Sequence, residues 1–302
     1  MQIASLDALK INFDAQALWT LNFALAWIMF GIALEISLSD FKELLKKPKP
    51  ILVGVCSQFI FLPIVTFLLV YIVKPTPSIA LGMFMVAACP GGNVSNFITH
   101  LAKGNSALSV SLTALATLLA IVMTPLNLKF WGSLYLPTAT LLEEIAISPL
   151  KMIQLVALLL GVPLILGMLV KYKFPIIAQK AAKVLKIVSL LFFIVLIFIA
   201  LFNNRDIFLE YIFYVLGITI FHNLLAFFTG FSFASIFQLS ARDKRAVTIE
   251  TGIQNSGLGL LLIFTFFEGL GGMALLAAFW GVWHLVSGLI LATYWNKKQI
   301  KK

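Results

Sequence analysis

The chain has 302 residues, of which 61% are hydrophobic and only 11% are charged. Soluble domains carry about 25% charged residues and about 45–50% apolar residues. A soluble globular domain is therefore excluded, since no core of this size could bury so much apolar surface. Long apolar runs recur along the whole chain, and they predict one integral membrane domain.

A net charge of +10 would suggest nucleic acid binding in a soluble protein. Here the basic residues lie in short segments between apolar runs, so we interpret them as orientation signals facing anionic lipid head groups. Nucleic acid is not expected as a partner. Cys56 and Cys89 lie inside apolar runs and imply no disulfide framework. Residues 1–15 lack the features of a signal peptide, so the first spanning helix is expected to direct insertion.

The predicted fold class is an all-α, polytopic membrane protein with about nine transmembrane helices. The spans are predicted at about 16–37, 50–73, 78–102, 106–130, 149–170, 187–203, 209–237, 246–267 and 272–295. A longer connection with Glu143 and Glu144 separates the fourth span from the fifth. A basic amphipathic stretch, 171–186, precedes the sixth span.

The distribution of basic residues predicts the orientation of the chain. With the N-terminus outside, most of the 22 lysine and arginine residues lie in cytoplasmic segments. The exceptions are Lys10, Lys74, Lys129, Lys151 and Arg205. Positive residues concentrate in cytoplasmic loops. We therefore expect a multi-pass protein of the cell (inner) membrane, with the N-terminus outside and the C-terminus in the cytoplasm.

The third and eighth spans contain helix breakers and polar groups within their apolar runs. The two motifs are Cys89-Pro90-Gly91-Gly92-Asn93-Val94-Ser95-Asn96 and Glu250-Thr251-Gly252-Ile253-Gln254-Asn255-Ser256-Gly257. Proline removes a backbone donor, and glycine weakens helix continuity. Such breaks survive in a membrane only where protein or a water-filled cavity covers them. Broken helices at matching positions of two inverted halves indicate the binding site of a transporter.

Glu250 is the carboxylate placed deepest in a span, whereas Glu35 and Glu210 lie near span ends. A charge at membrane depth costs about 2.5–3.5 kcal/mol on insertion scales. One interpretation is an interfacial position near Arg245; the other is a cation ligand or a proton carrier. The neutral oxygen donors nearby favour a hard monovalent cation, and no pair of Cys or His residues at metal spacing predicts zinc.

Other intramembrane polar residues have two interpretations. Ser109 and Thr113 lie four residues apart and share one helix face, where they could join helices or bind a ligand. Gln58 lies among Phe and Leu residues, which is typical of an interhelical hydrogen bond. His222 and His284 are lone histidines within spans, and such residues are more often packing residues than ligands.

The two motifs, together with 102–109, resemble those of the bile acid:sodium symporter family. The likeness extends from Met29-Phe30-Gly31 to Trp280-Gly281-Val282-Trp283-His284. This resemblance implies two broken helices that cross in a core domain, at about 50–130 and 209–295. A panel domain would comprise about 16–37 and 149–203. The chain would be the nine-helix form that lacks the usual first helix.

The resemblance also implies two sodium sites. The first would use Ser95, Asn96, Ser109, Thr113 and Glu250. The second would use Gln58, Glu250, Gln254 and the backbone carbonyls of Thr251 and Ile253. The shared carboxylate would make binding of the two ions mutually dependent. Asn93, Val94, Asn255 and His284 match positions that bind an organic anion. Leu285 follows His284 where relatives commonly carry Asn, and this departure concerns the substrate contacts alone.

We therefore expect sodium-coupled symport of an organic anion, such as a bile-acid-like, steroid or small carboxylate compound, by alternating access. The partners would be two Na⁺, the anion and the lipid bilayer, with no cofactor and a monomeric protein. A proton-coupled or exchange carrier, in which Glu250 titrates, is an open alternative. A passive channel is another. An intramembrane enzyme using Ser95 or His284 would need a nucleophile–base signature, which is not recognisable.

Overall fold

The computed structural model describes residues 6–7, 9–10, 15–36, 48–145, 148–203 and 205–297. Every regular element within these residues is a helix. The elements are α1 (Ala15–Ala33), α3 (Pro48–Cys56), a π-helical segment (Ser57–Phe61), α4 (Leu62–Val73), α5 (Pro77–Ala88), α6 (Val94–Leu101), α7 (Ser106–Leu134), α8 (Leu136–Ile145), α9 (Pro149–Val156), a second π-helical segment (Ala157–Gly161), α10 (Val162–Lys173), α11 (Pro175–Asn203), α12 (Arg205–Ile236), α13 (Ala241–Gly252), α14 (Ser256–Phe266) and α15 (Gly271–Lys297).

Each predicted span corresponds to one helix, to a pair of shorter helices, or to two α-helices joined by a π-helical segment, so the prediction of an all-α polytopic fold is confirmed. Five continuous helices in the described residues are long and apolar enough to cross a membrane: 48–73, 106–134, 149–173, 210–236 and 271–297. The end of the first predicted span, at residue 37, lies outside the described residues.

The connection expected after the fourth span is instead the helix α8. Thr138 is fully buried near its start, and its hydroxyl donates to the Gly132 carbonyl at 2.6 Å. Leu142 lies against Gly132, where a Cβ atom would come within 2.7 Å of the leucine Cδ1. Because Gly132 has no side chain, the apolar side of α8 can pack directly on α7. This tertiary contact accounts for a helix that the sequence of 136–145 did not indicate.

The third and eighth predicted spans are each broken into two helices, as expected. Cys89 leaves the helical conformation, with φ −70° and ψ 156°, because the following Pro90 disfavours a helical residue before it. Ile253 is also extended, with φ −106° and ψ 103°. Each span therefore contains a short non-helical segment within its apolar length.

The two breaks cross and hydrogen-bond to each other. Gly91 and Gln254 form an antiparallel bridge. The Gly92 N–H donates to the Ile253 carbonyl at 2.7 Å, and the Asn255 N–H donates to the Pro90 carbonyl at 2.9 Å. Each break thereby satisfies backbone groups of the other, which lipid could not do.

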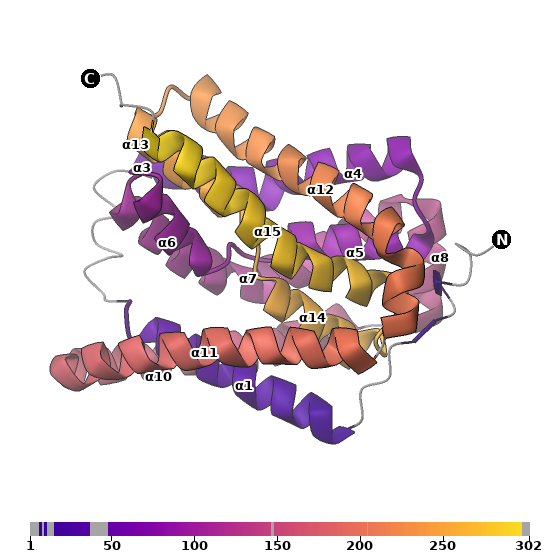
Figure 1. Ribbon diagram of the computed structural model, residues 1–302, viewed down its shortest axis with the longest axis horizontal. Coiled ribbons are helices and arrows are strands. Elements are labelled where there is room, and N and C mark those ends of the chain that lie inside the picture. Colours follow the sequence, from indigo (N-terminus) through magenta and orange to yellow (C-terminus); the bar gives the residue numbers. More distant parts are fainter. Residues whose placement is uncertain are drawn as a thin grey trace.

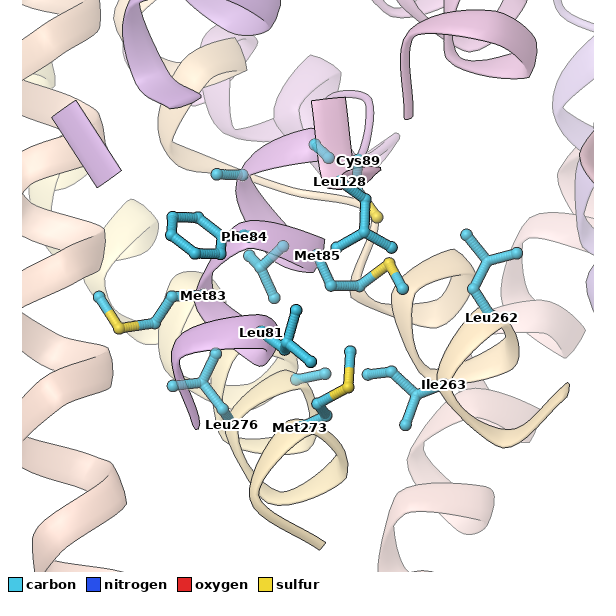
Figure 2. Close-up of a cluster of buried hydrophobic side chains, with 14 of the residues drawn as sticks. Leu81, Met83, Phe84, Met85, Cys89, Leu128, Leu262, Ile263, Met273 and Leu276 are labelled. Atoms are coloured by element: carbon cyan, nitrogen blue, oxygen red, sulfur yellow. The ribbon is translucent and has the colours of Figure 1, made fainter. Parts of the chain in front are cut away.

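One half-helix, α5, lies at the centre of the largest buried cluster. Figure 2 shows Leu81 and Met85 of α5 facing side chains of α14 and α15, among them Ile263 and Met273. Gly82 permits a close approach, because a Cβ atom there would lie 3.0 Å from the Cα of Met273. The first crossing helix is therefore held along its length by elements of the second half of the chain.

At one end of the molecule, the loop after α6 is joined to the start of α13. Arg245 Nη1 donates to the Ala102 carbonyl at 2.6 Å, and Asn105 Nδ2 donates to Asp243 Oδ1 at 2.6 Å. Lys103 Nζ reaches the carbonyl of Asn296, near the end of α15, at 3.0 Å. The end of α6 and the start of α13 therefore lie at the same face, as oppositely directed spans require.

At the other end of the molecule, Asp7, Leu9 and Lys10 contact the ends of helices from both halves. The Ser78 N–H, in the first turn of α5, donates to Asp7 Oδ1 at 2.7 Å. The Gly271 N–H, at the start of α15, donates to the Leu9 carbonyl at 2.7 Å. Lys10 forms an ion pair with Glu268, which follows α14. These contacts tie together the ends of both halves at this face.

α1, α10 and α11 lie together along one side of the molecule (Figure 1). Leu34 packs with Ala178 and Ala182 of α11. Gly167 of α10 lies so close to α1 that a Cβ atom there would be 2.4 Å from the Cβ of Ala33. These three helices correspond to the first, fifth and sixth predicted spans, while the division into a core and a panel domain and their relative movement stay predictions.

The packing of α10 on α1 predicts a matched pair of glycine variants. Gly167→Ala is expected to destabilise the protein by about 1–3 kcal/mol, because the added methyl group overlaps Ala33. Gly217→Ala, in α12, should be neutral or slightly stabilising, because no atom lies within 4 Å of its added Cβ and alanine favours a helix. Thermal unfolding of the purified protein in detergent measures both. Equal melting temperatures for the two variants would contradict the α1–α10 contact.

Candidate functional site

Glu250 lies in α13, less than one turn before the second break, with only 2% of its surface exposed. Ser95 Oγ donates to Oε2 at 2.6 Å, and Thr113 Oγ1 lies 2.8 Å from Oε1 and 3.0 Å from Oε2. Every hydrogen bond recorded to this carboxylate in the described residues comes from a hydroxyl group, and none comes from a basic side chain. The interfacial interpretation of Glu250 is therefore not supported, whereas Glu35 and Glu210 are exposed.

The five side chains predicted for the first sodium site form one network. Asn96 Oδ1 accepts from Ser109 Oγ at 2.9 Å and from Thr113 Oγ1 at 3.2 Å. Ser95 Oγ lies 3.3 Å from Thr113 Oγ1. The side chains come from the first turn of α6, from one face of α7 and from the end of α13. Because Ser109 and Thr113 lie four residues apart on one helix, their side chains share one face, as the sequence indicated.

This network has more acceptor positions than hydrogens. Thr113 Oγ1 has oxygen neighbours on Ser95, Asn96 and Glu250 within 3.3 Å, yet it carries a single hydrogen to donate. A buried anion without an ionic partner is costly unless a positive charge accompanies it. The cluster is thus suited to a small cation that oxygen atoms coordinate.

The donor types also limit which cation fits. In the described residues the side-chain atoms that hydrogen-bond to Glu250 are oxygens, which suit hard cations rather than zinc or copper. Within the described residues no group of three or more His, Cys, Asp and Glu residues could hold a metal ion. Calcium takes six to eight oxygen ligands, commonly from several carboxylates. One carboxylate with neutral oxygens fits a monovalent cation better.

Most residues predicted for the second sodium site also lie together. The amides of Gln58 and Gln254 pair, with Gln58 Nε2 at 2.8 Å from Gln254 Oε1. Gln254 Nε2 donates to the Thr251 carbonyl at 2.7 Å. The Ile253 carbonyl is engaged by the other break, and no hydrogen bond between Glu250 and these groups is recorded in the described residues. The structure therefore brings Gln58, Thr251 and Gln254 together, whereas the hydrogen bonds of Glu250 are made with residues of the first predicted sodium site.

The first break lies in direct contact with the Glu250 carboxylate. A Cβ atom at Gly91 would lie 2.1 Å from Glu250 Oε1. A glycine is required here because any side chain would occupy the position of the carboxylate oxygen. This contact places the carboxylate between the two crossing segments.

Three of the four residues expected to bind the substrate lie at the crossover. Asn93 and Val94 begin α6, Asn255 precedes α14, and all three are partly exposed. Asn255 Oδ1 caps α14 by accepting from the Leu258 N–H at 3.0 Å, whereas Asn93 Oδ1 is buried with no partner. His284 is 5% exposed in α15, and its Nδ1 has no hydrogen-bond partner among the residues that the structure describes. No recorded hydrogen bond joins His284 to the other three in the described residues.

Several residues near the breaks were not predicted from the sequence. Thr124 Oγ1 donates to the Ala88 carbonyl at 2.7 Å, Asn223 Nδ2 donates to the Gly252 carbonyl at 2.8 Å, and Ser57 Oγ lies 2.9 Å from Thr251 Oγ1. The available signal was a polar residue inside an apolar span. That signal does not reveal which backbone group the residue contacts.

His222 has a different environment from the site. Its Nε2 lies 2.8 Å from Thr66 Oγ1, and its ring meets Trp280 edge-on at 4.8 Å. Both contacts join α12 to neighbouring helices. His222 is therefore part of the helix packing beside the crossover.

Comparison with known proteins gives the same picture. The Sodium Bile acid symporter family model matches residues 22–211. A relative from Bacillus subtilis (strain 168), named "Uncharacterized sodium-dependent transporter YocS", is 37% identical over 91% of this chain and 82% of its own. The "Probable sodium/metabolite cotransporter BASS1, chloroplastic" of Arabidopsis thaliana is 28% identical over 94% of this chain and 68% of its own. "Sodium/bile acid cotransporter 4" of Mus musculus is 31% identical over 77% of this chain and 52% of its own.

The extent of the family match and the identity to the bacterial relative agree with the crossing broken helices and the oxygen cluster at Glu250. An enzyme using Ser95 is not supported, because the serine hydroxyl meets Glu250 and Thr113 rather than a histidine. The chain is a multi-pass membrane transporter, not an enzyme, and it belongs to the sodium bile acid symporter family.

Proposed function

We propose that this protein is a sodium-coupled symporter of an organic anion that works by alternating access. The observation that carries the proposal is a buried carboxylate, Glu250, whose hydrogen-bond partners in the described residues are hydroxyl groups, where two broken helices cross. The printed names of its relatives, which include sodium-dependent transport and cotransport with bile acid, support the same function.

The first Na⁺ binds among Ser95, Asn96, Ser109, Thr113 and Glu250. Binding makes the hydroxyl hydrogens turn away from the ion, so that the oxygen lone pairs coordinate it. The charge of Glu250 is then compensated inside the protein. The network has more acceptor oxygens than hydrogens to donate, and this supports the binding of a cation there.

The second Na⁺ binds at Gln58, Gln254 and the carbonyls of Thr251 and Ile253, with Glu250 shared between the two ions. The amide pair of Gln58 and Gln254 opens to supply its oxygen atoms. One carboxylate near two cations leaves a net positive charge. Because each ion stabilises the carboxylate arrangement that the other needs, sodium binding is cooperative.

The anion binds last, beside the crossover at Asn93, Val94, Asn255 and His284. The positive charge left by two Na⁺ and one carboxylate attracts it. The starts of α6 and α14 add the positive ends of two helix dipoles. Asn93 Oδ1 and His284 Nδ1, both buried without partners, are available for a ligand with hydrogen-bonding groups.

Between the outward-open and the inward-open state, a rigid core moves relative to the layer formed by α1, α10 and α11. The contacts of Arg245 and Asn105 join the end of α6 to the start of α13 at one face, and those of Asp7 and Leu9 hold the starts of α5 and α15 at the other. Both faces of the crossover are thus fixed within the core, which favours motion as one body. The protein lies in the cell membrane as a monomer, with its N-terminus outside and its basic loops in the cytoplasm.

A set of side-chain variants tests the first sodium site. Glu250→Gln is expected to abolish stabilisation by Na⁺, because no negative charge remains to attract the ion. Thr113→Val should raise the half-saturating Na⁺ concentration about tenfold through the loss of one ligand. Thr117→Val is the control, since that hydroxyl donates only to the Thr113 carbonyl one turn away. The melting temperature is measured against Na⁺ concentration, with K⁺ keeping the ionic strength constant.

The sodium proposal fails if Na⁺ and K⁺ stabilise the wild-type protein equally. A proton-coupled carrier is indicated if uptake follows a pH gradient without sodium. Full sodium-dependent stabilisation of Glu250→Gln would also contradict the assignment of that carboxylate.

The contact between Gly91 and the carboxylate predicts a backbone variant. Gly91→Ala should prevent binding of Na⁺, because its Cβ would lie 2.1 Å from Glu250 Oε1. Gly259→Ala is the matched control, since the nearest atom to its Cβ would be Cys89 Sγ at an ordinary 3.5 Å. Sodium titrations of the melting temperature compare the two. Unchanged sodium binding in Gly91→Ala would show that the carboxylate does not occupy this position when it binds the ion.

The order of binding predicts a dependence of the anion on sodium. Thermal stability is measured with a panel of bile acids, steroid sulfates and small carboxylates, each in Na⁺ and in K⁺. A transported anion should raise the melting temperature in Na⁺ and have little effect in K⁺. An anion that stabilises the protein equally in both salts contradicts sodium-first binding.

A further inference from the structure

The second broken helix is anchored by a buried amide outside the predicted sodium sites. Asn223 of α12 is fully buried, and its Nδ2 donates to the carbonyl of Gly252, the last residue of α13, at 2.8 Å. Its Oδ1 accepts from Ser287 Oγ of α15 at 2.6 Å. Because the Gly252 carbonyl can only accept, the amide must turn its NH₂ group toward it, and Ser287 satisfies the other end.

The same arrangement occurs at the first break. Gln58, from the helix that precedes the first broken helix, donates to the Cys89 carbonyl at 2.8 Å. Asn223 lies in the helix that precedes the second broken helix and donates to the carbonyl that ends its first half. The two amides thus perform matching roles in the two halves. The sodium assignment includes Gln58 but gives no role to Asn223.

α12 approaches the second break closely around this hydrogen bond. A Cβ atom at Gly252 would lie 2.2 Å from the ring of Phe227, one turn beyond Asn223. A Cβ atom at Gly230 would lie 2.9 Å from the Cα of Thr248. The backbone of α13 is therefore fixed against α12, and the Asn223 amide is the polar group that determines where the freed carbonyl points.

The direction of the Gly252 carbonyl affects the carbonyls beside it. Thr251 precedes it within the helix, and Ile253 follows it in extended conformation. Successive carbonyls of an extended segment point to opposite sides. A Gly252 carbonyl held toward α12 therefore turns the Ile253 carbonyl away from α12 and toward the first break, where it accepts from the Gly92 N–H at 2.7 Å.

We propose that Asn223, oriented by Ser287, is a positioning residue that directs the Ile253 carbonyl toward the second sodium ion. It acts through the Gly252 carbonyl and does not contact the ion. This inference rests on the proposed sodium-coupled function. It adds a determinant of the second site that lies on a different helix from the ligands.

The test uses the complete protein and Na⁺ alone as the probe. Asn223→Ala removes the donor, Asn223→Asp replaces it with an acceptor of the same shape, and Ser287→Ala removes only the group that orients it. Thr229→Val, on the same helix, is the control, because its hydroxyl donates to the Leu225 carbonyl of its own helix. Sodium titrations of the melting temperature, at constant ionic strength with K⁺, give the half-saturating concentration and the Hill coefficient.

Wild type and Thr229→Val should bind Na⁺ with a Hill coefficient approaching 2, the number of proposed sites. Asn223→Ala and Asn223→Asp should lower the coefficient toward 1 and raise the half-saturating concentration about tenfold. Ser287→Ala should show the same change to a smaller extent. A purely structural role would lower the melting temperature in K⁺ and leave the Hill coefficient unchanged.

The outcomes separate this inference from the proposed function. If wild type does not distinguish Na⁺ from K⁺, the sodium-coupled function is wrong and the inference fails with it. If wild type binds Na⁺ cooperatively and the Asn223 variants keep its Hill coefficient and half-saturation, only the role of Asn223 is overturned. Should the Asn223 variants not fold, an unchanged Hill coefficient and half-saturation in Ser287→Ala overturns the inference.

Discussion

The mutual hydrogen bonding of two broken helices is the constraint on which the rest of this structure depends. A backbone that leaves the helical conformation within a membrane exposes donors and acceptors that lipid cannot satisfy. Here the Gly92–Ile253 and Pro90–Asn255 hydrogen bonds satisfy part of each break with the other. Neither break could exist at this depth alone, so the two halves of the chain must meet at this point.

The groups that the crossing leaves unsatisfied determine which helices surround it. The Ala88, Cys89 and Gly252 carbonyls accept from Thr124, Gln58 and Asn223, each on a different helix. Each of these polar residues lies in an otherwise apolar span. The surrounding helices therefore hold the crossover by polar contacts as well as by the apolar packing of α5 that Figure 2 shows.

The same geometry creates the chemistry of the site. Glu250 lies in the last turn of α13, Ser95 and Asn96 lie in the first turn of α6, and the crossing brings these two helix ends together beside α7. A carboxylate so placed has oxygen neighbours, no recorded basic partner in the described residues, and almost no exposure to solvent. A bound cation resolves this electrostatic imbalance, which links the architecture of the crossover to ion coupling in the proposed mechanism.

The sequence by itself determined the membrane class, the helical fold and the positions of both breaks, because these follow from local signals: apolar length, and proline and glycine within a span. A carboxylate at membrane depth marked Glu250, whereas the other residues of the first oxygen cluster were implied as a set by the resemblance to a known family. Only the tertiary structure decided that 136–145 is a helix, that the second set of predicted ligands is closed by an amide pair, and that Asn223 and Thr124 anchor the breaks. The hydrogen bonds of the amide pair, Asn223 and Thr124 join residues from 29 to 196 positions apart. A single sequence records the polarity of each partner, but which donor meets which carbonyl depends on how the helices pack.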